Sequence, residues 1–297
     1  MKIFKGQNLI EFTECYKTDQ DFREYLSKIK WSEQCICRKC GYTKSQIRKD
    51  FASTCNICSD TESAMANTLF HKVKFGLKKA FFICFEMSTS TKSLLASQTA
   101  VRFGVHERTA RLFMYKVREA MKSSQDHPMT GVVNVDEYVV DGYEEGKPGR
   151  SYDSIKKKAV CALELTDDGK VKRFYTFQIP DYLAKSLRKI FDKHIDKHAK
   201  ITTDKWKGYN PIAKDYDLSP ILSDKGSNFK ALHIMIYQLK SWLRTTYSWV
   251  SENNINRYFD EFFYRINRSQ SKDTIFNNLI KSMVKSDNIT HQKIICA

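Results

Sequence analysis

The sequence predicts an α/β domain built on a mixed sheet, preceded by a cysteine-rich segment and a helical segment. After His127-Pro128 the apolar pattern changes from helical spacing to β-branched and aromatic runs, which are typical of strands. Strand, hairpin, helix, strand and helix then follow in order, as expected of an α/β layer. We therefore expect three parts, an N-terminal helix with the cysteines (1–60), a helical domain (61–126) and the α/β domain with C-terminal helices (127–297).

The cysteine-rich segment contains two CxxC pairs, Cys37/Cys40 and Cys55/Cys58, separated by fourteen residues. A CxxC turn presents two thiolates to one ion, and zinc takes four such ligands in a tetrahedron. This spacing predicts a zinc ribbon with a structural Zn²⁺, since four protein ligands leave no open position. A redox pair or buried thiols is the alternative. Cys35 could replace Cys37, but only Cys37 keeps the two-residue gap.

The helical segment contains an apolar stripe followed by two shorter helical patterns. We expect a helix whose buried stripe consists of Phe70, Val73, Leu77, Phe81, Cys84 and Phe85. The two later patterns meet at Phe103-Gly104-Val105, and Ala100 followed by Gly104 fits the turn of a helix-turn-helix.

The second of these helices has an apolar side and a basic side. The apolar side consists of Ala110, Phe113, Val117 and Met121. The basic side, which we expect to contact DNA, consists of Arg108, Arg111, Tyr115, Arg118 and Lys122. A solvated face on an ordinary helical hairpin is the alternative.

The charge balance favours a polyanionic partner. Fifty Lys and Arg against thirty-four Asp and Glu give a net charge of +16, and nucleic acid is the commonest partner for such a surplus. A basic surface that reflects an AT-rich genome is the other interpretation. No stretch approaches the roughly 20 apolar residues of a membrane helix, and the first residues lack a secretory signal. We therefore expect a cytoplasmic protein with reduced thiols.

Two aspartates in the α/β domain are candidates for metal binding. Asp136 lies inside the apolar strand GVVNVDEYVV, where a carboxylate is costly unless it binds a metal or a partner. Asp204 ends the short strand AKITTD. Such a pair can hold Mg²⁺, or Mn²⁺, for attack on a phosphodiester. Pleat alternation places Glu137 on the opposite face of the strand. Taken singly, each Asp is more often a turn or cap residue.

The third metal ligand is left open by the sequence. The following helix, NFKALHIMIYQLKSWLR, contains no acid. His233 or Gln238 could supply a neutral ligand, and Lys240 could bind a phosphate. Glu261 is a further candidate, although an i,i+4 surface ion pair with Arg265 is the favoured interpretation.

These features occur together in one order: the zinc knuckles, FHKVKFGLKKAFFICFEMSTSTKS, VNVDEYVVDG, ITTDKWKGY, LHIMIYQLKSWLR and YFDEFFYRINR. In this order, almost end to end, the sequence resembles the ISXO-like group of bacterial insertion-sequence transposases in the Merlin superfamily of DDE-type transposases. The resemblance implies an RNase H-like catalytic core that cuts DNA at terminal inverted repeats and joins the ends elsewhere. It also implies that Asp136 and Asp204 are the two catalytic aspartates. Some branches of this family replace the third acid of the triad with a neutral residue followed by Lys. By this resemblance, Gln238 is the neutral residue and Lys240 is the lysine.

The sequence therefore predicts a metal-dependent DNA transposase of the bacterial cytoplasm, associated with the nucleoid. Its partners would be double-stranded DNA, both terminal repeats and target, and further copies of the chain in a homodimer or higher multimer. Two alternatives stay open. One is a non-catalytic DNA-binding regulator derived from a transposase, and the other is an RNase H-like nuclease that selects branched or hybrid structures.

Overall fold

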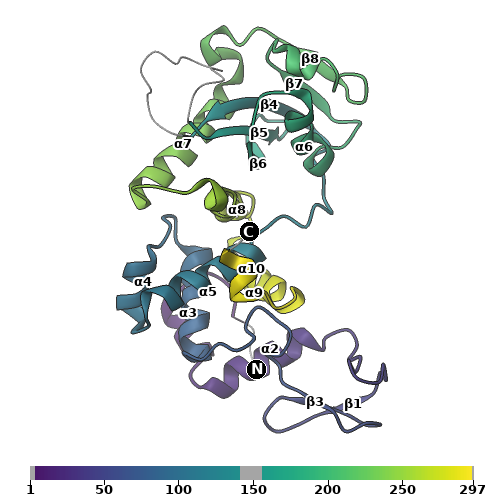
Figure 1. Ribbon diagram of the computed structural model, residues 1–297, viewed down its shortest axis with the longest axis vertical. Helices are drawn as coiled ribbons and strands as arrows, with labels where there is room; N and C mark the ends of the chain where they lie inside the picture. Colours follow the sequence, from purple (N-terminus) through teal and green to yellow (C-terminus); the bar gives the residue numbers. More distant parts are fainter. Residues whose placement is uncertain (1–3, 141–155, 296–297) are drawn as a thin grey trace. The chain divides into compact units, whose positions relative to one another are not determined.

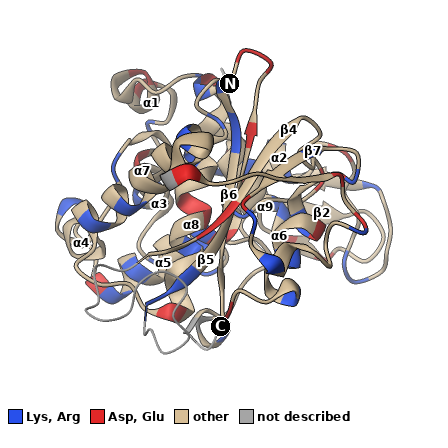
Figure 2. Ribbon diagram, turned by 90° about the horizontal axis from the view of Figure 1, so that it is seen from above, with Lys and Arg blue, Asp and Glu red and all other residues tan. Residues whose placement is uncertain are grey.

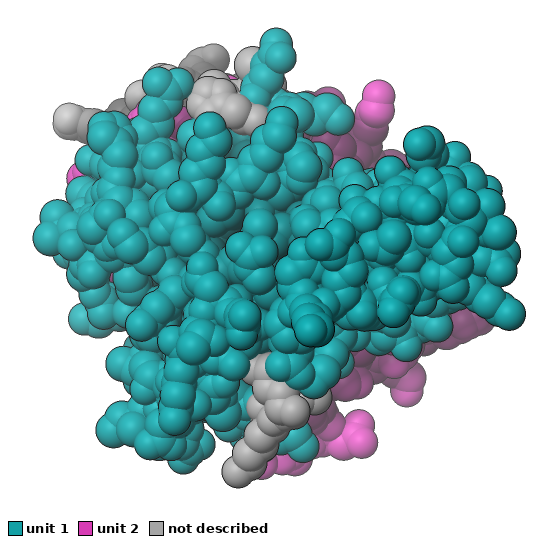
Figure 3. Space-filling model, turned by 90° about the horizontal axis from the view of Figure 1, so that it is seen from below, with its two compact units in different colours: residues 1–121, 268–297 teal, residues 122–267 magenta. Residues whose placement is uncertain are grey.

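The computed structural model describes residues 4–140 and 156–295, and the chain divides into two compact units. Unit 1 comprises residues 1–121 and 268–297, and unit 2 comprises residues 122–267 (Figure 3). Residues 268–297 are expected from the sequence in the α/β domain, whereas the structure places them in unit 1. Each unit is described separately.

Unit 1 is mostly helical and has an aromatic core. Its helices are α1 (Leu9–Cys15), α2 (Asp19–Lys30), α3 (Leu77–Thr89), α4 (Ala96–Phe103), α5 (Glu107–Ala120), α9 (Ile275–Lys285) and α10 (His291–Ile295), with a 3-10 turn η3 (Lys272–Thr274) before α9. Helix α9 packs against α2, α3 and α5 (Figure 1). The ring of Phe276 on α9 contacts Phe12, Phe81 and Phe85. This apolar face explains why the C-terminal residues complete unit 1, since burying it there removes it from water.

The predicted apolar stripe from Phe70 is only partly helical. Helix α3 begins at Leu77, and residues 71–76 form a loop without regular structure. Gly76 precedes the helix with a φ of +95°, a conformation that favours glycine. Phe70 is nevertheless fully buried and stacks on Phe81. The residues of this stripe therefore reach the core from a loop and from the helix that follows it.

The cysteine-rich segment forms a small antiparallel sheet. Its strands are β1 (Ser45–Ile47), β2 (Ser53–Cys55) and β3 (Thr61–Glu62), in the order β1-β2-β3. The turns around this sheet bring the two CxxC pairs together, since Cys37 N–H donates to Tyr42 O and Cys55 N–H donates to Asp60 O.

Unit 2 contains one mixed five-stranded sheet. Its strands are β4 (Val132–Val139), β5 (Lys158–Leu165), β6 (Val171–Ile179), β7 (Lys200–Thr203) and β8 (Leu218–Pro220). The order is β6-β5-β4-β7-β8 (Figure 1). β4, β5 and β6 are antiparallel, while β7 and β8 run parallel to β4. Three consecutive antiparallel strands extended by two parallel ones are the arrangement of an RNase H-like core, so the expected fold class is confirmed.

Helices cover the sheet of unit 2. They are α6 (Ala184–His194), α7 (Lys230–Thr246) and α8 (Glu252–Ile266), with two 3-10 turns, η1 (Lys207–Tyr209) and η2 (Asp224–Phe229). α6 and α8 pack on β6, while α7 packs on β4. The turn between β5 and β6 is the predicted hairpin, in which Gly169 has a φ of +77°. None of the helices in the described ranges is both long and apolar enough to span a membrane.

Candidate metal centres and DNA-binding surface

The four cysteines of the two CxxC pairs converge in unit 1. Their sulfur atoms all lie within 4.8 Å of one another, with 3.5 Å between Cys37 and Cys58 and 3.6 Å between Cys40 and Cys55. Zn–S bonds of about 2.3 Å in a tetrahedron place sulfur atoms about 3.8 Å apart, close to these separations. Backbone N–H groups of Cys58 and Ile57 lower the pKa of Cys55 to about 6, whereas desolvation and hydrogen bonds with the neighbouring thiols raise the pKa of Cys40. The donor set therefore fits a structural Zn²⁺.

Cys35, the alternative ligand, lies outside this cluster. Its sulfur is 3.1 Å from Ser53 Oγ. The first pair at the cluster is therefore Cys37 and Cys40, the pair that the two-residue gap favours.

The two candidate aspartates lie side by side at the end of strand β7. β4 and β7 are parallel, and their last paired residues are Val135 and Thr203. Asp136 directly follows Val135, and Asp204 directly follows Thr203, so the register brings the two carboxylates together. Asp136 is 8% exposed, and Asp204 is partly buried.

Glu137 joins these aspartates, contrary to the expectation from pleat alternation. One carboxylate oxygen from each of Asp136, Glu137 and Asp204 lies within 4.8 Å of the others. The pairing of β7 with β4 ends opposite Val135, so the longer Glu137 side chain can reach the aspartates around this edge. The hydroxyl of Tyr209 donates to Glu137 Oε2 at 2.6 Å and holds the carboxylate in place. Sequence reasoning missed this acid because the alternation rule assumes an uninterrupted neighbouring strand.

The segment after β7, Asp204 to Tyr209, is a compact turn that orients Asp204. Asp204 Oδ1 accepts a hydrogen bond from the backbone N–H of Trp206 at 3.0 Å. The Trp206 indole N–H donates to the carbonyl oxygen of Tyr182, also at 3.0 Å. A Cβ at Gly208 would lie 2.5 Å from the indole nitrogen and 2.7 Å from the same carbonyl oxygen. Only glycine fits there, and the turn then places Tyr209 against Glu137.

Helix α7 places His233 next to the carboxylates. Its Nε2 lies 3.3 Å from Asp136 Oδ2. Gln238 is exposed, and five residues of helix rotate it about 140° from His233, so the two cannot face the same carboxylates. Lys240, seven residues on, returns to within about 20° of His233. Its Nζ lies 5.5 Å from the centre of the Tyr138 ring on β4.

Burial shapes the charge states on this face of α7. Burial lowers the pKa of His233, and the positive charge of Lys240 lowers it further. Burial also lowers the pKa of Lys240, and Arg244 adds to that effect. A neutral imidazole is the form that binds a metal ion.

The position of His233 depends on a glycine in η2. Gly226 has a φ of +91°, and a Cβ there would lie 3.1–3.3 Å from three atoms of the His233 ring. The backbone of η2 therefore forms a wall against the imidazole that only glycine permits.

The donors present fit a divalent cation that prefers oxygen. Three carboxylates this close repel one another, and a cation between them removes that repulsion. Carboxylate oxygens are the ligands that Mg²⁺ and Mn²⁺ prefer, and an imidazole is compatible with Mn²⁺. Glu261 does not belong to this group of acids. It is fully buried on α8 and pairs with Arg265, so the pair is a buried one rather than the surface pair expected.

The helix-turn-helix of unit 1 consists of α4 and α5. Gly104 ends α4 in the left-handed conformation, as the turn requires. Basic residues lie along α5 (Figure 2). Arg108, Arg111 and Lys122 are exposed, and Arg111 pairs with Glu107 one turn earlier.

One predicted member of this surface is absent from it. Arg118 is 2% exposed, and its guanidinium lies 5.8 Å from the centre of the Tyr115 ring. The apolar side of α5 is wider than four residues, since Met114 is also buried, and this wider face includes Arg118. Arg118 is therefore corrected from a DNA-contacting residue to an interior one, and Tyr115 is partly buried beside it.

Comparison with known proteins finds one family model, of a transposase domain, that matches unit 2. The matching family model is described as the ISXO2-like transposase domain, and it covers residues 128–267. It contains the sheet, both aspartates, Glu137 and His233.

Two solved structures show a weak likeness. The first, "Crystal structure of a pre-cleavage Mos1 transpososome", has a TM-score of 0.24 and 9% identity, over 67% of this chain and 76% of that chain. The second, "Mos1 transposase paired-end complex with left transposon end", has a TM-score of 0.20 and 12% identity, over 66% and 76%. Likeness at this level carries no weight for the activity of this chain. No curated protein matches the sequence.

Proposed function

We propose that this chain is a DNA transposase that binds terminal inverted repeats and cuts and joins DNA with a divalent cation held by Asp136, Asp204 and Glu137. The observation that supports this proposal is the convergence of three carboxylates at the end of β7, inside the segment that matches the transposase domain. We assign the neutral third position to His233 rather than Gln238, because only His233 faces Asp136.

The chemistry divides between the cation and the protein. Mg²⁺ or Mn²⁺ held by these carboxylates would activate the attacking hydroxyl group and offset negative charge at the scissile phosphate. Tyr209 and Gly208 fix the carboxylates of Glu137 and Asp204 before DNA arrives. Lys240, on the same face of α7 as His233, is placed to hold a phosphate oxygen of the substrate.

Unit 1 would provide DNA recognition. The ribbon, held by Zn²⁺ on Cys37, Cys40, Cys55 and Cys58, and the exposed side of α5 form its DNA-binding part. On α5 we retain Arg108, Arg111 and Tyr115 as contacts to the duplex, and we also retain Lys122, which lies two residues after the end of this helix. Two transposon ends must be processed together, so we propose a homodimer or higher multimer at work. Its place of action would be the bacterial cytoplasm, on DNA of the nucleoid.

A cleavage assay tests the proposal. The substrate is a labelled duplex that carries the inverted repeat flanking the gene, with Mg²⁺ or Mn²⁺. We expect nicking at the repeat end by the wild type, and a loss of at least 100-fold, on the order of a removed catalytic charge, in Asp136→Asn and Asp204→Asn. Asp192→Asn is the matched control, because Asp192 lies on α6, outside the site, and contacts Tyr216.

The other outcomes distinguish the alternatives. Tight binding of the repeat without cleavage in either metal would favour the non-catalytic regulator. Cleavage that ignores the repeat sequence and follows branched or hybrid structure would favour the nuclease. Equal cleavage by the wild type and Asp136→Asn would refute the assigned centre.

A further inference from the structure

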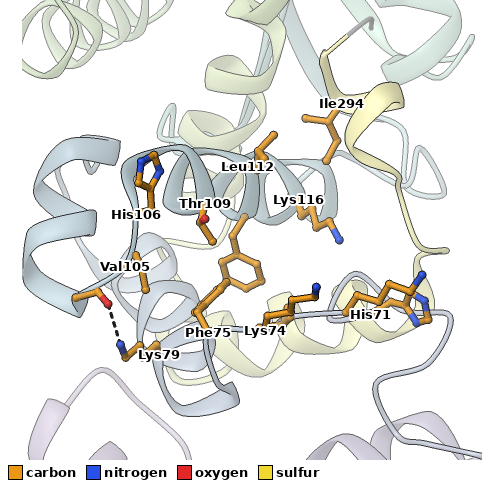
Figure 4. A pocket seen from close by; sticks show the side chains of 14 residues that line it. His71, Lys74, Phe75, Lys79, Val105, His106, Thr109, Leu112, Lys116 and Ile294 are labelled. Carbon is orange, nitrogen blue, oxygen red and sulfur yellow. Dashed lines mark hydrogen bonds between the residues drawn. The ribbon is translucent and has the colours of Figure 1, made fainter.

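Unit 1 contains a basic cavity that the proposed DNA-binding side of α5 does not include. Its volume is about 560 Å³, and it lies between the loop 71–75 and one stripe of α5, Thr109, Leu112 and Lys116 (Figure 4). Six of its lining residues are Lys or His, and no lining residue is acidic. These six are His71, Lys72, Lys74, Lys79, His106 and Lys116.

The loop presents lysines outward and apolar groups inward. Lys72 and Lys74 are exposed, whereas Val73 and Phe75 between and after them are partly buried. Lys72 has a φ of +55°, a conformation that non-glycine residues seldom adopt. Phe75 and Leu112 both line the cavity, with Leu112 directed towards Ile294, so apolar groups lie beside the basic ones (Figure 4).

The two histidines each present a hydrogen-bond donor. Nδ1 of His71 accepts from the backbone N–H of Asn67 at 3.4 Å, and Nδ1 of His106 accepts from that of Arg108 at 3.2 Å. An imidazole whose Nδ1 accepts must hold its proton on Nε2. Each ring therefore offers an N–H to a ligand whether or not it is charged.

The lysines of the cavity have neutral partners. Lys79 Nζ donates to the carbonyl oxygen of Gly104 at 2.9 Å, and Lys116 Nζ lies 3.5 Å from Asn288 Oδ1. Burial lowers the pKa of His71, and the positive charges of Lys72 and Lys116 lower it further, so these groups act on one another. A cluster of cations beside apolar groups, with no acid in its lining, fits an anion that also has an apolar part.

We propose that this cavity holds the phosphodiester backbone of one DNA strand, with phosphates on Lys72, Lys74 and Lys116 and deoxyribose against Leu112 and Phe75. The inference rests on the proposed DNA binding and specifies a second contact surface for it. Duplex DNA is favoured over an acidic peptide because the cavity stripe of α5 lies beside exposed Arg108 and Arg111. Proteins of this class contact the backbone beside the groove that the helix enters.

The test is the salt dependence of duplex binding by the full chain. Each lost phosphate contact lowers the slope of log K against log salt by about 0.9. The double variant Lys72→Gln/Lys74→Gln should lower it by about 1.8, so that raising salt from about 50 to about 200 mM weakens binding about 12-fold less than in the wild type. The matched control is Lys78→Gln/Lys281→Gln, which removes two exposed charges of unit 1 outside the cavity. It should keep the wild-type slope to within a few tenths.

Competition separates the possible ligands. Wild-type binding of duplex with an unchanged slope in the double variant would overturn the cavity proposal while leaving DNA binding intact. If polyglutamate, rather than duplex, bound less tightly to the double variant, the cavity would be a site for an acidic peptide and the proposal would be wrong. Absence of duplex binding by the wild type would overturn both the proposed function and this inference. Circular dichroism of both double variants verifies that unit 1 remains folded.

Discussion

Replacing Gly226 with Ala tests whether η2 positions His233 at the carboxylates. The added Cβ would lie 3.1 Å from Cε1, 3.2 Å from Nδ1 and 3.3 Å from Nε2 of His233. Carbon atoms in ordinary contact are about 3.5–4.0 Å apart, so the ring must move by a few tenths of an ångström. The His233–Asp136 separation is already 3.3 Å, and we expect that movement to lengthen it.

The expected effects differ in size for stability and for metal binding. Ala at a φ of +91° costs about 1–3 kcal/mol of unfolding free energy through backbone strain. Displacing a metal-contacting imidazole lowers metal affinity or cleavage rate by about 10–100-fold. We would measure Mn²⁺ affinity by calorimetry, cleavage rate on the repeat duplex, and Tm.

Gly169→Ala separates the two effects. Gly169 lies in the β5–β6 turn of the same unit with a φ of +77°, and a Cβ there meets no atom within 4 Å. It should share the loss of stability and keep wild-type metal affinity. In a His233→Ala background, Gly226→Ala should cause no further loss of cleavage. If Gly226→Ala and Gly169→Ala bind Mn²⁺ equally well, the positioning role of η2 is refuted.

Three further predictions concern other parts of the structure. Burial lowers the pKa of His194 to about 4 from its ordinary 6.5, so the unfolded chain takes up this proton first as pH falls. The contribution of His194 to the free energy of unfolding is then fully present above pH 6.5 and declines by about 3 kcal/mol towards pH 4. Urea unfolding of His194→Phe should lack this decline. An unchanged decline in the variant would show that His194 does not cause it. Tyr209→Phe removes the hydrogen-bond donor to Glu137 and should cost about 1–3 kcal/mol of unfolding free energy. It should also weaken Mn²⁺ binding several-fold, as measured by calorimetry. Wild-type Mn²⁺ affinity in the variant would show that the hydroxyl does not position Glu137. Cys58→Ser should lower zinc content, measured by mass spectrometry, from one atom per chain towards none; retained zinc would contradict the assigned ligands.

Four of the five strands described in unit 2 could be predicted because their signal is local, whereas the three-residue β8 was not predicted. β-branched runs, a hairpin turn and an intervening helix each leave a pattern in the residues that form them, and together they define the order of these elements along the chain. The two aspartates follow from the same patterns, since both stand at strand positions that the sheet brings together.

The rest of the site depends on where elements end and which faces meet. Glu137 reaches the aspartates because the pairing of β7 ends opposite Val135, and no pattern in β4 records that boundary. The sequence leaves His233 and Gln238 open as the neutral ligand, the family resemblance points to Gln238, and only the packing of α7 on β4 separates them.

Unit 1 shows the same limit of local patterns. Arg118 carries a charge and lies at the spacing of an exposed stripe, yet tertiary packing buries it. Phe276 and its neighbours form an amphipathic helix whose pattern predicts a buried face without naming the core that receives it. That core is in unit 1, more than 180 residues earlier in the chain.

The most direct test of the central claim is strand joining by a pre-cleaved end. A duplex that ends in a free 3′-hydroxyl at the inverted repeat is incubated with the full chain, Mg²⁺ and a target plasmid, and joined products are sequenced. We predict joined molecules with the wild type and with Asp192→Asn, and none with Asp136→Asn or Asp204→Asn. Hydrolysis of the DNA without joined products, or joining that survives loss of both aspartates, would contradict a transposase centred on these carboxylates.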